Sequence, residues 1–150
     1  MSSQPEPQMD PLFAEMIDDY FAECEEHLVA LRHQLLEIEA ATDSRQQNPT
    51  LVFETYRRFH SLKGLSGMVS YVELEELVHQ VESFLRLLRD DEKRLDTSAL
   101  DVIFAAVQAF EEGLQLRKTE NRAADLDKII AEVRRLIPST GQDEPSDEQS

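Results

Sequence analysis

The stretch YRRFHSLKGLSG, residues 56–67, lies inside a chain whose other segments are mostly typical of amphipathic helix. On a helical period, four of its residues share one face, at spacings i, i+3, i+4 and i+7: His60, Lys63, Gly64 and Gly67. A glycine inside a helix costs about 1 kcal/mol relative to alanine, so two glycines beside a histidine indicate a need for clearance. An imidazole with open space and a nearby cation is suited to carrying a phosphoryl group.

The local charge favours the same interpretation. Residues 49–72 contain Arg57, Arg58 and Lys63 against the single acid Glu54, a balance of +2 in a chain whose net charge is −16. Arg57 and Lys63 flank His60 at i−3 and i+3, where cations would stabilise the roughly two negative charges of a phosphoryl group. The alternative is a surface histidine among solvated basic residues.

Helical segments surround this stretch on both sides. Four N-terminal signals mark helix starts: Asp10-Pro11, Asn48-Pro49, the capping box Ser70 to Glu73, and Asp96 or Thr97. Apolar residues recur every three or four positions from Phe13 to Ile38, Val52 to Leu62, Leu74 to Leu88, Leu100 to Leu114 and Leu126 to Ile137. We therefore expect an all-α fold, an antiparallel up-down bundle of four long helices plus a shorter C-terminal fifth.

The ends of the chain differ in composition from its middle. Residues 1–9 are polar and proline-containing, and residues 139–150 are acidic with no apolar stripe. We interpret residues 1–9 as a disordered lead, residues 10–138 as one helical-bundle domain, and residues 139–150 as an acidic linker or disordered tail.

Composition excludes several classes of partner and compartment. The net charge of −16 would repel nucleic acid and anionic membranes. No apolar run approaches the roughly 18 residues of a membrane span, and no signal peptide is visible. A single cysteine, Cys24, allows no internal disulfide and fits a reducing compartment. These features indicate a cytoplasmic, acidic, helical domain.

A second polar strip follows on the next predicted helix. His79, Glu82 and Arg86 are spaced i, i+3 and i+7, and could face His60 if the two helices pack antiparallel. A carboxylate on one imidazole nitrogen fixes the tautomer and leaves the other nitrogen as nucleophile, a role for which Glu82 is the candidate. An exposed polar face is the alternative interpretation.

The sequence does not support a metal site or a nucleotide-binding site. A di-iron bundle site needs two Glu-x-x-His pairs, and the chain has one, Glu76 to His79. No Gly-x-Ser-x-Gly and no Walker-type glycine loop is present, so no nucleophilic enzyme and no ATP site of its own is expected. Cys24 is expected to be a core residue.

The octet His60-Ser-Leu-Lys-Gly-Leu-Ser-Gly67 resembles the histidine phosphotransfer (HPt) signature His-x-x-Lys-Gly-x-x-Gly, and more closely the amino-terminal P1 domain of CheA-type chemotaxis kinases. The resemblance extends to the long acidic first helix (residues 13–39), the LEELVHQVE segment (residues 74–82) and the terminal helix LDKIIAEVRRLI (residues 126–137). It covers about residues 11–137, nearly all of the predicted domain.

The resemblance implies roles for individual residues. His60 would be the phospho-accepting histidine, Lys63 would lie near the phosphoryl group, and Gly64 would give partners access. Glu82 and His79 would belong to the polar network that orients the imidazole. The chain departs from the family where a further glycine often precedes an aromatic residue, because Ser70-Tyr71 stands there.

The resemblance also implies a mechanism and partners. A histidine-kinase catalytic domain would place the γ-phosphoryl of ATP on His60, and the receiver domain of a response regulator would take it onto an aspartate and supply the magnesium. The domain would be a relay without a cofactor of its own, monomeric in isolation. The alternatives are a docking or scaffold bundle that is never phosphorylated, and a standalone phosphotransfer protein rather than a kinase fragment.

Overall fold

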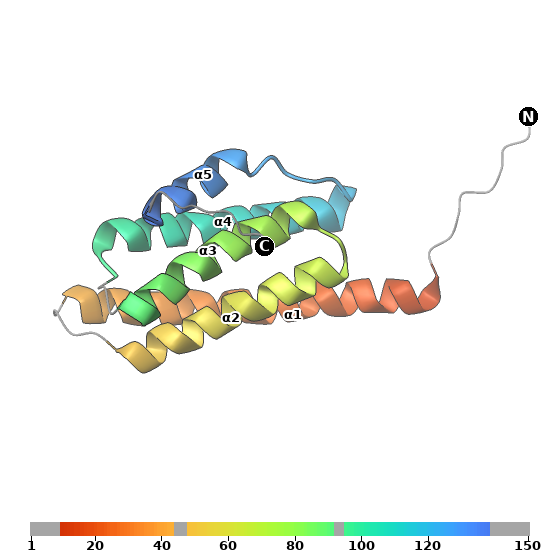
Figure 1. Cartoon of the computed structure of the whole chain (residues 1–150). Coiled ribbons are helices and arrows are strands. Elements are labelled where there is room, and N and C mark those ends of the chain that lie inside the picture. Colours follow the sequence, from red (N-terminus) through yellow and green to blue (C-terminus); the bar gives the residue numbers. More distant parts are fainter. Residues whose placement is uncertain (1–9, 44–47, 92–94, 139–150) are drawn as a thin grey trace, which may run out of the picture.

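The computed structural model describes residues 10–43, 48–91 and 95–138, and within these ranges every element is an α-helix (Figure 1). The helices are α1 (Pro11–Asp43), α2 (Pro49–Met68), α3 (Val72–Asp91), α4 (Thr97–Glu120) and α5 (Asp127–Leu136). The predicted all-α bundle of four long helices and a shorter fifth is confirmed. The expectations for residues 1–9 and 139–150 lie outside the described residues.

The four long helices form a closed bundle. α1 contacts α2 and α4, and α3 contacts the same two helices from the other side. α5 lies across α3 and α4, and the first turns of α1 project beyond the rest of the bundle (Figure 1). That projection explains why Phe13, which the apolar stripe assigns to the core, has 41% of its surface exposed.

Local capping chemistry sets two of the helix starts. The Asn48 side chain accepts a hydrogen bond from the Leu51 N–H at 3.1 Å, with Pro49 at the first helical position. The Asp96 side chain accepts from the Ala99 N–H at 2.8 Å, so Asp96 and not Thr97 caps α4. Both predicted caps are confirmed.

The predicted capping box at Ser70 is wrong. Ser70 has φ = 62°, in the left-handed region that favours glycine, and its N–H donates to the Gly67 carbonyl at 3.1 Å. The carbonyl of Tyr71 instead accepts hydrogen bonds from the N–H groups of Leu74 and Glu75 in the first turn of α3. Glu73 does not reach back to Ser70, because its two oxygens each accept a 2.8 Å hydrogen bond from Arg117 of α4.

The core is a continuous apolar cluster between the helices. The predicted stripes of α3 are buried throughout, and Cys24 of α1 is fully buried, as expected. Gly113, inside α4, has a packing role. A β-carbon there would lie 2.9 Å from Leu74 Cδ2, so glycine lets α4 approach α3 closely. α4 continues past Gly113 to Glu120, and Asn121, with φ = 52°, is its C-cap.

Within the described ranges, none of the helices is both long enough and apolar enough to cross a bilayer.

Candidate functional site

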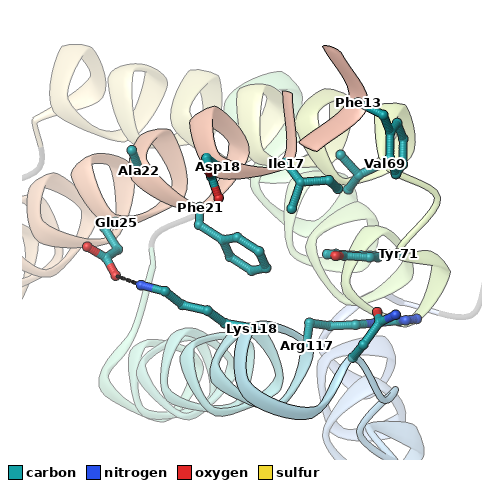
Figure 2. A pocket seen from close by; sticks show the side chains of 11 residues that line it. Phe13, Ile17, Asp18, Phe21, Ala22, Glu25, Val69, Tyr71, Arg117 and Lys118 are labelled. Carbon is teal, nitrogen blue, oxygen red and sulfur yellow. Dashed lines mark ion pairs between the residues drawn. The ribbon is translucent and has the colours of Figure 1, made fainter. Parts of the chain in front are cut away.

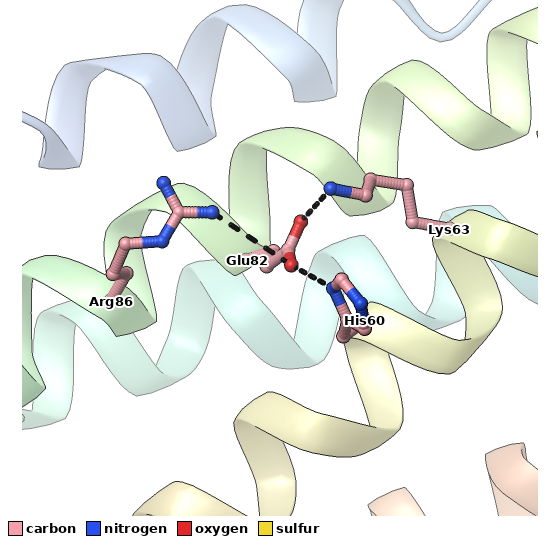
Figure 3. A network of polar contacts seen from close by, with 4 residues as sticks. All are labelled: His60, Lys63, Glu82 and Arg86. Atoms are coloured by element: carbon pink, nitrogen blue, oxygen red, sulfur yellow. Dashed lines mark hydrogen bonds and ion pairs between the residues drawn. The ribbon is translucent and has the colours of Figure 1, made fainter.

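The candidate site lies where α2 packs along α3. α2 presents His60 with 62% of its side chain exposed, and α3 contributes Glu82, whose side chain is completely buried. His60 Nδ1 is hydrogen-bonded to Glu82 Oε2 (Figure 3). The histidine side chain is therefore anchored at its inner nitrogen by a group that solvent does not reach.

Two cations share the Glu82 carboxylate with His60. Lys63 Nζ lies 2.6 Å from Oε1, and the nearest Arg86 nitrogen lies 3.8 Å from Oε2, on the opposite side of the carboxylate (Figure 3). Burial raises the pKa of Glu82, but the hydrogen bonds and charges of Lys63 and His60 outweigh burial, and the net pKa lies below the usual value. Glu82 is thus a carboxylate at neutral pH.

This arrangement fixes the chemistry of the two imidazole nitrogens. A carboxylate only accepts hydrogen bonds, so Nδ1 carries a proton, and in the neutral ring Nε2 then holds the lone pair. The Tyr56 ring stacks beside the imidazole with centroids 6.3 Å apart and planes inclined by 25°. His60 is therefore an oriented nucleophile with Nε2 as its reactive atom.

The two glycines of the octet have different surroundings. Gly64 is exposed, and a β-carbon built on it would meet nothing within 4 Å. A β-carbon on Gly67 would lie 3.0 Å from a carboxylate oxygen of Glu75 on α3. Gly64 thus leaves open space one turn from His60, whereas Gly67 allows α2 and α3 to approach each other.

The other predicted site residues lie at the surface. Arg57 is exposed, with its guanidinium carbon 6.0 Å from the centre of the Phe53 ring. The His79 side chain is exposed too, and it makes no hydrogen bond or ion pair with another residue of the described ranges. The structure therefore does not join His79 to the His60 network, in which Arg86 is the additional member.

No group of three or more histidine, cysteine, aspartate or glutamate side chains among the described residues is arranged to hold a metal ion. The residues around His60 instead offer cations and a nucleophile, an arrangement that suits an anionic group.

A large pocket lies away from His60. It has a volume of about 800 Å³ between α1, the α2–α3 turn and the end of α4 (Figure 2). Its two cations are already used within the fold. Arg117 binds Glu73 and lies 4.3 Å above the Tyr71 ring, and Lys118 lies 3.7 Å from a Glu25 oxygen. None of the predicted site residues lines this pocket.

Comparisons with known proteins identify similar sequences and a similar fold. A family model described as "Hpt domain" matches residues 15–137. The chemotaxis protein CheA of Listeria monocytogenes is 28% identical over 123 residues, covering 81% of this chain and 19% of that protein. CheA of Cereibacter sphaeroides is 30% identical over 127 residues, covering 83% of this chain and 18% of that protein. The chain thus spans about a fifth of the length of these relatives.

Among solved structures, the fold matches the phosphorylated P1 domain of CheA3 in complex with CheY6 from R. sphaeroides. The TM-score is 0.72 at 18% identity, and the match covers 81% of this chain and 94% of that one. At this identity the match concerns the fold.

Proposed function

The chain belongs to the Hpt domain family, and from that premise we propose that it is a histidine phosphotransfer domain whose phosphoryl group is carried by His60. The observation that carries the proposal is the pairing of an exposed imidazole with a fully buried carboxylate. The pairing orients His60 and leaves Nε2 open to a partner. The domain is then a relay that acts as substrate and donor, and the ATP is bound elsewhere.

Loading is a displacement at the γ-phosphorus of ATP. The Nε2 lone pair forms the N–P bond, the bond from phosphorus to the bridging oxygen breaks, and ADP leaves with that electron pair. The ring then carries a positive charge that the Glu82 carboxylate stabilises through Nδ1–H. Lys63 and Arg57 supply positive potential for the transferred group. A histidine-kinase catalytic domain supplies the ATP, and its own site holds the magnesium.

Unloading breaks the N–P bond that loading formed. An aspartate oxygen of a response-regulator receiver domain attacks phosphorus, the N–P bond breaks, and its electron pair returns to Nε2. The solved P1 domain of similar fold was captured in complex with CheY6, and a receiver is the corresponding partner proposed here. Gly64 leaves room for that partner beside His60. The domain needs no cofactor of its own, and the proposal implies a two-component, chemotaxis-type pathway in the cytoplasm.

The test is phosphoryl transfer from ATP with a CheA-type kinase catalytic domain, followed by addition of a receiver. We expect a label on the domain that is acid-labile, stable to base and drained by the receiver. His60→Gln should abolish the label and keep the helical content. His33→Gln, at an exposed histidine of α1, is the matched control and should label like the wild type.

Labelling of His60→Gln at the wild-type level would remove His60 from the proposal. No label on a folded wild-type domain with several kinases would favour the alternative, a docking bundle that is never phosphorylated.

A further inference from the structure

A second polar pocket lies on the flank of α2 that faces α1, away from Glu82. It has a volume of about 390 Å³ and is lined by His27, Gln34, Glu54, Arg57, Arg58 and Ser61. We name it the Arg58 pocket. Its lining holds two guanidinium groups against one carboxylate, so it is a cationic site in a chain of net charge −16.

An unusual hydrogen bond orients the half-buried Arg58 side chain. Arg58 Nη1 lies 3.0 Å from His27 Nδ1. A guanidinium has donors only, so Nδ1 must accept, and His27 is neutral with its proton on Nε2. Burial, and next the charge of Arg58, lower the pKa of His27 below its usual value. The interaction fixes the direction of Arg58, but neutral His27 does not neutralise its positive charge.

Neither arginine of the pocket has an acidic partner among the described residues. Arg58 Nε is buried and makes no hydrogen bond within those ranges. Elsewhere on the bundle, arginines do find carboxylates: Arg32 pairs with Glu111, Arg117 with Glu73, Arg122 with Glu120 and Arg134 with Glu76. A guanidinium held in a fixed direction without a carboxylate is suited to receiving one from outside, because its fork of donors matches a carboxylate.

The pocket adjoins the phospho-accepting residue. Ser61 follows His60 directly in the chain, and Arg57 lies about one helical turn before it. A domain that covers the exposed face of His60 therefore reaches the edge of the pocket. The positive charge of the pocket determines which side chain such a domain can insert, since a basic side chain would be repelled by both arginines.

We propose that the Arg58 pocket is a docking site for a carboxylate side chain of the receiver domain, which enters between Arg57 and Arg58 while the receiver covers His60. The proposal rests on the relay function above. On docking, the carboxylate gives Arg58 the acidic partner that it lacks in the free domain. Positive charge beside His60 also draws an acidic receiver to this face before contact, so the pocket contributes to the association rate as well as to the lifetime of the complex.

The experiment uses the receiver that drains the label from His60 in the transfer assay, so failure of the relay is detected before docking is measured. Binding of that receiver to the unphosphorylated domain is followed by calorimetric titration. We expect Arg58→Gln and Arg57→Gln each to weaken binding by about tenfold, a loss of one buried or partly buried charge pair. Arg122→Gln removes the same charge far from the pocket and should bind like the wild type.

A complementary measurement locates the contact. In a nitrogen-15 labelled domain, the Nε–H signal of Arg58 should shift on addition of the receiver. Thermal unfolding of each variant verifies the fold, and Arg57→Gln, at an exposed residue, tests the pocket without disturbing the core.

Wild-type affinity in both arginine variants would overturn the proposal. So would an equal loss in Arg122→Gln, which would reduce the effect to net charge, and so would an unmoved Arg58 signal at saturating receiver.

Discussion

Replacing Glu82 with glutamine tests the central contact of the site, because it keeps the shape of the side chain and removes its charge. The carboxylate is fully buried, is hydrogen-bonded to His60 Nδ1, and lies 2.6 Å from Lys63 Nζ. Glutamine can still accept from Nδ1–H through its carbonyl oxygen, but leaves Lys63 facing a neutral group. We expect loss of both stability and phosphorylation rate, with the helical content unchanged.

The magnitude follows from the interactions removed. Hydrogen bonds to a charged group contribute about 1.5–3 kcal/mol each, and the relieved burial of the carboxylate charge offsets part of that loss. A net loss of about 2 kcal/mol in the free energy of unfolding corresponds to a fall in Tm of about 6 °C for a domain of this size. If the carboxylate stabilises the phosphorylated ring by about 1.4 kcal/mol more than the amide does, phosphorylation slows about tenfold.

The pKa of Glu82 predicts in which direction the stability difference between wild type and Glu82→Gln changes with pH. The pKa of Glu82 in the fold lies below the usual value, so folding favours its ionised form. The stability that Glu82 contributes is complete above the pKa of an unfolded glutamate, about 4.3, and is lost as the pH falls through the lower folded value. The difference between wild type and Glu82→Gln should therefore be full at pH 7 and shrink below about pH 4.

Urea unfolding at a series of pH values, with labelling rates at pH 7, measures both effects. Glu76→Gln is the matched control on the same helix, because Glu76 makes an exposed ion pair with Arg134 and should cost less than about 1 kcal/mol. A Glu82→Gln domain as stable as the wild type at pH 7, and labelled at the same rate, would refute the reasoning.

Three further substitutions test the glycines and the turn. Gly64→Ala should stabilise the domain by about 1 kcal/mol, because the added β-carbon would meet nothing within 4 Å. The same substitution should slow phosphoryl transfer to the receiver, and an unchanged transfer rate would show that Gly64 does not provide access for the partner. Gly113→Ala should instead destabilise by about 1–3 kcal/mol, since its β-carbon would lie 2.9 Å from Leu74 Cδ2, and a raised urea midpoint would contradict that packing. Ser70→Gly should stabilise by about 0.5–1 kcal/mol by relieving a left-handed φ of 62°, with a lowered Tm as the contrary result.

The sequence predicts the helices well where the signal is local. Asn48 and Asp96 cap helices through hydrogen bonds to residues three positions away, so the motif contains all the information. The capping box at Ser70 fails for the opposite reason. Its Glu73 is bound by Arg117, 44 residues along the chain, and nothing in the short motif signals that competitor.

The candidate site likewise has features that local spacing predicts and features that depend on how the helices pack. Helical spacing brings His60, Lys63 and Gly64 to one face, and spacing on the next helix offers Glu82 as a partner. The complete burial of Glu82 depends on how α2 packs along α3, which no spacing reveals. The contact between Arg58 and His27 joins two helices, and no spacing in the sequence pairs these residues, so only the structure finds it.

Only one nitrogen of the His60 ring faces outward, and this limits how the two partner domains can use the relay. Nδ1 of His60 is occupied by Glu82, so under the proposed function delivery and collection must both use Nε2, and the two partner domains exclude each other. Throughput then depends on how briefly each partner stays. A receiver that bound too tightly would block reloading, and a kinase domain that bound too tightly would block discharge. Evolutionary selection on the surface around His60 should therefore favour fast dissociation of each partner as well as specific binding. This sets an upper limit on the affinity of either partner for this surface.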